Sequence, residues 1–136
     1  MAIDETSVAE EANRLSHLII GAAIEVHRAL GPGLLESAYE ACVAHELRSS
    51  GLPVDCQRPL PVLYKGVHLD CGYRLDLVVG DLVIVELKTV DAFAPIHDAQ
   101  LLTYLKLTGL PLGLLINFNV PVLRSGIKRV AHRMDR

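Results

Sequence analysis

Two apolar runs that meet at Gly80-Asp81 constrain the fold of this chain more than any other feature. Residues 73–88 read YRLDLVVGDLVIVELK, and their content of Val, Leu and Ile is typical of buried, paired strands. A Gly-Asp pair between two such runs predicts a tight turn and therefore a β-hairpin. Three charged residues, Asp76, Glu86 and Lys88, interrupt these runs.

The three charges have the pattern that a phosphodiester-cleaving site needs. Side chains alternate between faces along a strand, so Glu86 and Lys88 project to the same side. Leu82 and Ile84 precede them on that face, which is apolar before it becomes charged at one end. Two carboxylates, Glu86 and Asp76, would bind a divalent cation through oxygen, and the ammonium would offset charge on a phosphate. The alternative is an ordinary solvated strand face, because this spacing is loose.

The length of the hairpin turn decides whether the two acids meet. A two-residue turn would send Asp76 and Glu86 to opposite faces of the sheet, and they would then share no metal ion. A three-residue connection, or a bulge of one residue, sets them directly across from each other. We therefore predict an odd-length or bulged hairpin, with a positive φ at Gly80 or Asp81.

Size and composition favour a single folded domain over residues 1–136, with about the first six residues flexible. Of the 136 residues, 51% are hydrophobic and 21% are charged, which excludes a disordered chain. No apolar run reaches the roughly 18 residues of a membrane span, so we expect no membrane association. The acidic start lacks the basic region of a secretory signal, and the three cysteines show no Cys-x-x-Cys spacing. We expect a cytoplasmic protein with reduced thiols.

The charge is distributed unevenly along the chain. A net charge of −3 argues against a protein that coats nucleic acid nonspecifically. Basic residues gather near the C-terminus, however, and Arg124, Lys128 and Arg129 are candidates for substrate contacts. Such a basic end either meets phosphates or is simply solvated, and charge alone does not distinguish these readings.

The spacing of apolar residues and of Gly and Pro predicts an α/β fold. Helices are expected near 7–30, 34–49 and 95–108, and strands near 57–64, 67–79, 82–88, 112–118 and 122–131. Pro59 and Pro61 cannot donate ladder hydrogen bonds, so the first strand should lie at a sheet edge. The helix between the third and fourth strands makes that pair parallel. The prediction is a mixed four-stranded sheet flanked by helices, with a further C-terminal strand.

A resemblance to a known family supports this reading. Gly33-Leu-Leu-Glu36-Ser-Ala-Tyr39 is the motif that names the GxxExxY protein family, which is similar to the PD-(D/E)XK nuclease superfamily. Residues 73–76, 85–88, 99–105 and 126–129 also match, so the resemblance extends from the first helix to about residue 132. It implies a restriction-endonuclease-like α-β-β-β-α-β core. It also implies a Mg²⁺-dependent nuclease, with Mn²⁺ as a substitute, that acts on DNA or RNA.

The resemblance implies roles for five residues. Asp76 and Glu86 would bind Mg²⁺, and Glu36 of the second predicted helix would complete the metal site. Lys88 would position or activate the attacking water. Gln100 on the later helix would complete the catalytic site. The proline that usually precedes the first acid is absent, and a leucine stands in its place.

Other candidates have structural alternatives that the sequence leaves open. Gln100 and Tyr104 share a helical face, with His97 a turn earlier, and such a stripe is either solvated or part of the site. Tyr39 would either hydrogen-bond a phosphate or only pack. Glu36 would otherwise complement the positive end of a helix.

Two classes of function follow from these observations. The leading hypothesis is a Mg²⁺-dependent nuclease. The alternative is a non-cleaving nucleic-acid-binding or regulatory partner protein on the same scaffold. Only 4 Tyr and 2 Phe are available for base stacking, which weakens the case for sequence-specific single-strand recognition. So small a domain would fit either a homodimer or a complex with a specificity partner. DNA and RNA, and endo- and exonuclease action, are not distinguished.

Overall fold

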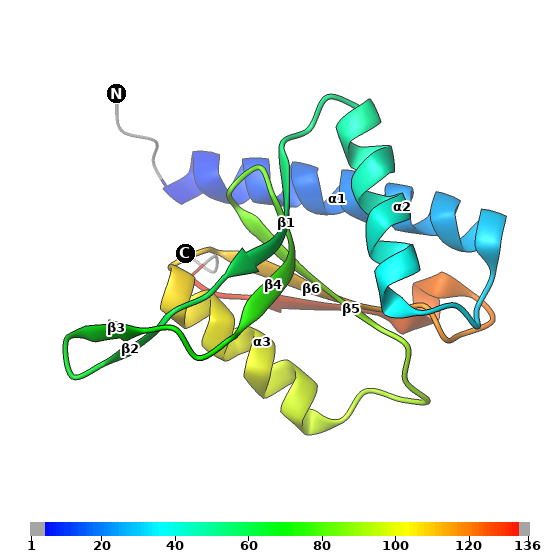
Figure 1. The fold of residues 1–136 in the computed structure, drawn as a ribbon. Coiled ribbons are helices and arrows are strands. Elements are labelled where there is room, and N and C mark those ends of the chain that lie inside the picture. The colour runs from blue at the N-terminus through cyan, green and yellow to red at the C-terminus, as the bar shows by residue number, and fades with distance from the viewer. Residues whose placement is uncertain (1–4, 134–136) are drawn as a thin grey trace.

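The computed structural model describes residues 5–133, which form a mixed sheet covered by helices (Figure 1). The elements in chain order are α1 (Glu5–Leu30), α2 (Glu36–Ser49), β1 (Val54–Pro59), β2 (Val62–Tyr64), β3 (Val67–Leu69), β4 (Arg74–Val79), β5 (Val83–Lys88), α3 (Pro95–Thr108), β6 (Leu112–Asn117), the 3₁₀ helix η1 (Leu123–Gly126) and β7 (Ile127–Ala131). The flexibility expected at the N-terminus concerns mainly residues 1–4, which lie outside the described range. Between residues 5 and 133, no helix is long and apolar enough to cross a membrane.

The sheet has the predicted mixed topology. Its five strands follow the order β1-β4-β5-β6-β7, in which β5 and β6 are parallel and the other neighbours are antiparallel. Helix α3 connects the two parallel strands. The α-β-β-β-α-β core and the further C-terminal strand are therefore confirmed. β1, which ends at Pro59, lies at the sheet edge as predicted.

Helices cover both faces of the sheet, with α1 and α2 on one side and α3 on the other (Figure 1). Val83 and Val85 of β5 belong to the core on the α1–α2 side, whereas Ile84 belongs to the core on the α3 side. Burial on both faces explains why β5 reads as a nearly continuous apolar run. Glu86 and Lys88 follow Ile84 at two-residue steps, so they extend the α3 face of the strand.

The segment before β4 differs from the prediction. The expected strands 57–64 and 67–79 are each divided, and β2 and β3 pair in a separate two-stranded sheet that projects from the body (Figure 1). Pro59 still pairs with Arg74 and Leu60 N donates to Tyr73 O at 3.0 Å, whereas Pro61, which has no amide hydrogen, follows where this ladder ends. A turn in which Asp70 Oδ1 accepts a hydrogen bond from Gly72 N at 2.9 Å separates β3 from β4. The continuous edge strand of the prediction is therefore a short edge strand followed by a hairpin.

The C-terminal strand is shorter than predicted. Residues 123–126 form η1, and only 127–131 pair with β6. A Cβ atom at Gly126 would lie 2.4 Å from the main-chain oxygen of Asn117, so this close approach requires glycine. The tight packing of η1 against the end of β6 replaces the first half of the expected strand.

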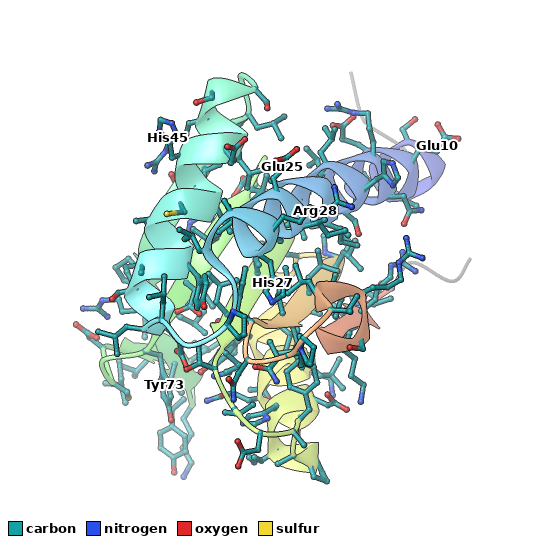
Figure 2. The ribbon with its side chains drawn as sticks, turned by 90° about the vertical axis from the view of Figure 1, so that its right-hand side faces the viewer. Glu10, Glu25, His27, Arg28, His45 and Tyr73 are labelled. Atoms are coloured by element: carbon teal, nitrogen blue, oxygen red, sulfur yellow. The ribbon has the colours of Figure 1, made fainter. Side chains whose placement is uncertain are left out.

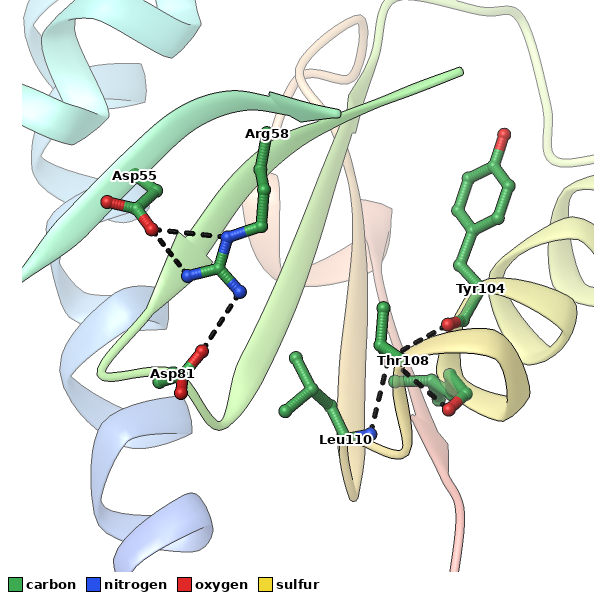
Figure 3. A network of polar contacts seen from close by, with 7 residues as sticks. Asp55, Arg58, Asp81, Tyr104, Thr108 and Leu110 are labelled. Atoms are coloured by element: carbon green, nitrogen blue, oxygen red, sulfur yellow. Dashed lines mark hydrogen bonds and ion pairs between the residues drawn. The ribbon is translucent and has the colours of Figure 1, made fainter. Parts of the chain in front are cut away.

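The turn between β4 and β5 has the length that the acids require. Val79 pairs with Val83, so the connection has three residues, 80–82, as predicted. Gly80 and Asp81 adopt φ values of 59° and 57°, which confirms the predicted left-handed backbone. Asp81 also forms an ion pair with Arg58 of β1, with 2.9 Å between Arg58 Nη1 and Asp81 Oδ1 (Figure 3). This contact ties the turn to the edge strand.

Candidate active site

β4 and β5 separate at the position of the two acids. The register pairs Leu77 with Val85, and the next step opposes Asp76 to Glu86. The ladder ends there, and Asp76 Oδ2 instead accepts a hydrogen bond from the main-chain nitrogen of Leu87 at 2.8 Å. A side-chain carboxylate thus takes the place of a main-chain acceptor. We call this position, with Asp76, Glu86 and Lys88, the fork.

Glu86 is the most perturbed acid of the fork. Only 6% of its surface is exposed, and its Oε1 atom is buried without a hydrogen-bond partner among the described residues. Burial raises the pKa of its carboxyl from 4.5 to about 9, and repulsion by Asp76 contributes to the increase. The positive charge of Lys88 acts in the opposite direction and lowers this pKa. The trio singled out by the sequence is therefore close together, and Lys88 is only partly buried.

Glu36 lies across a cavity from Asp76. It begins α2, and its Oε2 accepts hydrogen bonds from Thr89 N at 3.3 Å and from Thr89 Oγ1 at 3.4 Å. The cavity has a volume of about 360 Å³ and is lined by Glu36, Ser37, Glu40, Gln57 and Asp76. Within residues 5–133, no three His, Cys, Asp or Glu side chains gather closely enough to hold a metal ion. Glu36 is thus at the site without completing a three-carboxylate cluster.

Glu40 and Gln57 belong to this cavity, although the sequence did not single them out. Gln57 lies opposite Asp76 in the β1–β4 register, and its amide donates to Glu40 Oε1 and, at 3.4 Å, to Asp76 Oδ1. Its φ of 53° is unusual for a residue other than glycine. The pKa of Glu40 is raised overall. Burial is the largest cause, the hydrogen bond from Gln57 lowers the pKa, and repulsion by Asp76 raises it. The amide therefore bridges two carboxylates that repel each other.

A sequence signal existed for only one of these two residues. Glu40 follows Glu36 by four residues on a helix, so both side chains lie on one face. Nothing in the sequence distinguishes Gln57 from a solvated strand residue.

The polar stripe predicted on α3 consists of His97, Gln100 and Tyr104. Tyr104 and Gln100 face the region of the fork, whereas His97 has a structural contact. Tyr104 is 8% exposed, and the pKa of its hydroxyl is raised by burial and then by the charges of Glu86, Tyr73 and Asp76. It therefore lies near both acids. Gln100 is one turn earlier and lines a hollow together with Tyr73 and Tyr104. His97 Nδ1 accepts a hydrogen bond from Ala94 N at 3.0 Å, which is a helix-capping contact.

Tyr39 has a structural environment. Its side chain is fully buried, and its ring stacks on Phe118 at a centroid distance of 4.2 Å. The hydroxyl donates to Gly31 O at 2.5 Å and accepts from Leu34 N at 3.1 Å. These contacts hold the loop between α1 and α2, and they favour packing over the expected contact with substrate.

The three basic candidates near the C-terminus do not form one surface. Lys128 forms an ion pair with Asp98 of α3, and Arg129 donates to Asn13 of α1. Because α3 and α1 cover opposite faces of the sheet, these two cations point away from each other. Arg124 lines a different cavity, of about 380 Å³, near the end of α1. Their expected joint contact with a phosphate backbone is therefore not favoured by this arrangement.

The fold and the fork together define a nuclease-like α/β protein. The family model described as the PD-(D/E)XK nuclease superfamily matches residues 13–130, which include the fork and all of α3. The chain belongs to this superfamily. No curated protein and no solved structure matches the chain significantly.

The residues of the fork fit the divalent cation that this superfamily typically uses. Carboxylate oxygens are the ligands that Mg²⁺ prefers. A buried carboxylate oxygen without a partner, such as Glu86 Oε1, is costly unless a cation or donor satisfies it. Asp76 keeps Oδ1 for a further contact apart from the long hydrogen bond to Gln57. Asp76 and Glu86 would therefore bind Mg²⁺.

Proposed function

We propose that the protein is a Mg²⁺-dependent nuclease that hydrolyses phosphodiester bonds of DNA or RNA, with Mn²⁺ as a substitute cation. The observation that carries the proposal is the interaction of the Asp76 and Glu86 carboxylates at the fork, where Glu86 Oε1 is buried and has no partner among the described residues. The Asp76 carboxylate has a structural partner in Leu87 N, but Glu86 Oε1 has none among the described residues, and two acids that repel each other are costly here without a cation. Membership of the nuclease superfamily supports the same reading.

Each side chain of the proposed active site has a separate role in the reaction. Asp76 and Glu86 would hold Mg²⁺, which supplies positive charge that polarises the phosphodiester. Lys88 extends from the same face as Glu86, and its ammonium donates hydrogen bonds to the phosphate or to the attacking water. Tyr104 is buried on the α3 side of the sheet, where it packs with Leu75 and Ile84. Glu36 lines the cavity beside Asp76 and would complete the metal site.

A finer assignment rests on the motif alone. We infer that within the superfamily the chain is similar to the GxxExxY proteins, because Gly33, Glu36 and Tyr39 have that spacing. In this structure the glycine has a φ of 104°, which bulkier residues rarely adopt, and the tyrosine holds the adjoining loop. The motif thus shapes the loop that begins α2 and brings Glu36 to the cavity.

The alternative function is a protein on the same scaffold that binds nucleic acid, or a regulatory partner, without cleavage. The absence of a three-ligand cluster within residues 5–133 favours it. For the nuclease function, the proposed partner is nucleic acid. A second copy of the chain or a specificity partner would join it. The proposed location is the cytoplasm.

Metal binding and cleavage together test the proposal. Mg²⁺ and Mn²⁺ are titrated by calorimetry, and labelled single- and double-stranded DNA and RNA are then incubated with each ion. We expect saturable binding that Asp76→Asn and Glu86→Gln abolish, and cleavage lost in the same variants. Cleavage that persists in both variants belongs to an impurity and removes the proposed site. Metal binding without any cleavage supports the alternative function.

A further inference from the structure

A hollow of about 270 Å³ lies beside the fork, between the start of β4 and the outer surface of α3. Its lining consists of Tyr73, Ile96, Ala99, Gln100, Thr103 and Tyr104. Two of these large hydrophobic side chains are exposed to solvent: Tyr73 is 44% exposed and Ile96 is 67% exposed. Figure 2 shows Tyr73 extending from the body of the protein. Exposed apolar surface around polar groups is typical of a binding site.

Two aromatic rings form one end of this hollow. The centroids of Tyr73 and Tyr104 are 6.1 Å apart, with the rings at 60°. Tyr104 belongs to the buried cluster on the α3 side, together with Leu75 and Ile84, so it forms a fixed wall. The main-chain oxygen of Tyr73 accepts a hydrogen bond from Leu60 N at 3.0 Å, which anchors the exposed ring to the sheet. Two of the four tyrosines of the chain thus contact each other at this end of the hollow.

The hollow lies next to the proposed site of cleavage. Tyr73 precedes Asp76 by three residues, which is about 10 Å along a strand. Leu75 and Ile84, which pack with Tyr104, flank the fork in sequence. Glu86 lies two residues after Ile84 on the same face of β5, so its carboxylate and the Tyr104 ring lie on the α3 side of the sheet. A ligand in the hollow would therefore be a direct neighbour of a phosphate at the fork.

We propose that the hollow binds an unpaired nucleobase of the strand whose phosphate lies at the fork, so that the substrate is single-stranded or has a frayed end. This inference rests on the proposed nuclease function and names its substrate class. The flat faces of a base stack on aromatic rings, and its polar edge can meet the Gln100 amide and the Thr103 hydroxyl. A base inside a duplex is stacked on both faces and paired along its edge, so it cannot enter.

Charge beside the hollow suits a nucleotide better than an apolar peptide side chain. Arg74 follows Tyr73 directly, and 40% of its side chain is exposed. Its Nη1 donates to the main-chain oxygen of Tyr73 at 2.9 Å and lies 3.7 Å from Asp70 Oδ1, and this surface ion pair is weak. The other nitrogens of the guanidinium remain for a phosphate. An aromatic ring with an adjacent cation is the combination that binds single strands without sequence preference.

The experiment measures binding in a Lys88→Ala background with Mg²⁺, in which the proposed mechanism retains metal but does not cleave. Single-stranded oligonucleotides of DNA and of RNA carry 2-aminopurine, whose fluorescence falls when it stacks, and matched duplexes serve for comparison. We expect quenching with the single strands only. Tyr73→Ala should abolish it and weaken binding by about 5- to 150-fold, the loss of one base–aromatic stack. Tyr73→Phe should retain both.

A matched control and the contrary outcomes separate this inference from the proposed function. Tyr64, 58% exposed on β2, is replaced by Ala as the control and should change neither quantity. If Tyr73→Ala binds the single strand as tightly as the parent, or loses single strand and duplex equally, the base site is wrong. Metal-dependent cleavage by the native chain would then leave the nuclease function intact. A chain that binds and cleaves no nucleic acid at all would overturn both proposals. The DNA and RNA arms show which sugar the strand carries.

Discussion

Replacing Glu86 by Gln should stabilise the metal-free protein while it destroys the metal site. The carboxyl is buried, and its pKa is raised to about 9 by that burial and by Asp76. At pH 7 the folded protein must therefore either carry a costly buried charge or hold a proton that the unfolded chain releases. Glutamine keeps the shape of the side chain and removes this penalty.

The size and sign of the effect follow from the two pKa values. At pH 7 the pH is about 2.5 units above the ordinary pKa of 4.5, and each unit corresponds to about 1.4 kcal/mol. The gain at pH 7 thus has an upper limit of about 3.5 kcal/mol. Because the folded pKa is raised, the folded state binds more protons between pH 4.5 and about 9, and this group makes stability fall as pH rises through that window. The gain from Glu86→Gln should be smallest near pH 4 and should grow toward pH 9.

Urea denaturation in EDTA from pH 4 to pH 8.5 measures the difference between the variant and the native chain. Glu25→Gln is the matched control, because Glu25 is exposed on α1 (Figure 2) and undergoes the same chemical change. Adding Mg²⁺ should then stabilise the native chain, by about 2.7 kcal/mol at 100 times the dissociation constant, and should leave Glu86→Gln unchanged. A stability difference that does not vary with pH would refute the reasoning.

Three further variants test the other assignments. Lys88→Ala should lose cleavage but keep Mg²⁺ binding by calorimetry, since an ammonium is no metal ligand; loss of both would make the lysine structural. Gln57→Ala should raise the pKa of Glu40 in an NMR titration, because the amide hydrogen bond lowers it and Asp76 raises it; an unchanged pKa would mean that this bridge does not form in solution. Tyr39→Phe should lower the free energy of unfolding by about 0.5–1.5 kcal/mol, because the partly buried Gly31 O and Leu34 N lose a hydrogen bond, with kcat/KM of the folded protein unchanged. A fall in kcat/KM would instead assign the hydroxyl to the substrate.

The order of elements was predictable because it depends on local patterns. The apolar run of β5 and the proline that begins α3 fix where these elements lie, and the crossover between β5 and β6 fixes their direction. The three-residue turn was predictable for a different reason. Only an odd-length or bulged connection brings Asp76 and Glu86 to the same face, so the turn was predicted from the proposed metal site and not from the turn residues themselves.

The sequence did not determine which side chains become partners across the fold. Lys128 and Arg129 are neighbours in a basic segment, yet one contacts Asp98 of α3 and the other Asn13 of α1. Adjacent strand residues point to opposite faces, which a count of charges cannot show. Tyr39 likewise belongs to a motif, but its partners are main-chain atoms of a loop, and no pattern of side chains indicates them. Gln57 depends on a local φ of 53° that its residue type does not suggest.

The fork combines a structural hydrogen bond with the proposed metal site. Where β4 and β5 diverge, the amide of Leu87 would lack a partner, and the carboxylate of Asp76 supplies one. The same carboxylate repels Glu86, whose Oε1 has no partner among the described residues. Asp76 thus supplies the hydrogen-bond acceptor that the ladder lacks. The buried charge of Glu86 leaves a deficit of positive charge, which Lys88 offsets only in part. A divalent cation would remove that deficit, so Mg²⁺ should raise the folding stability of the native chain but not that of Glu86→Gln.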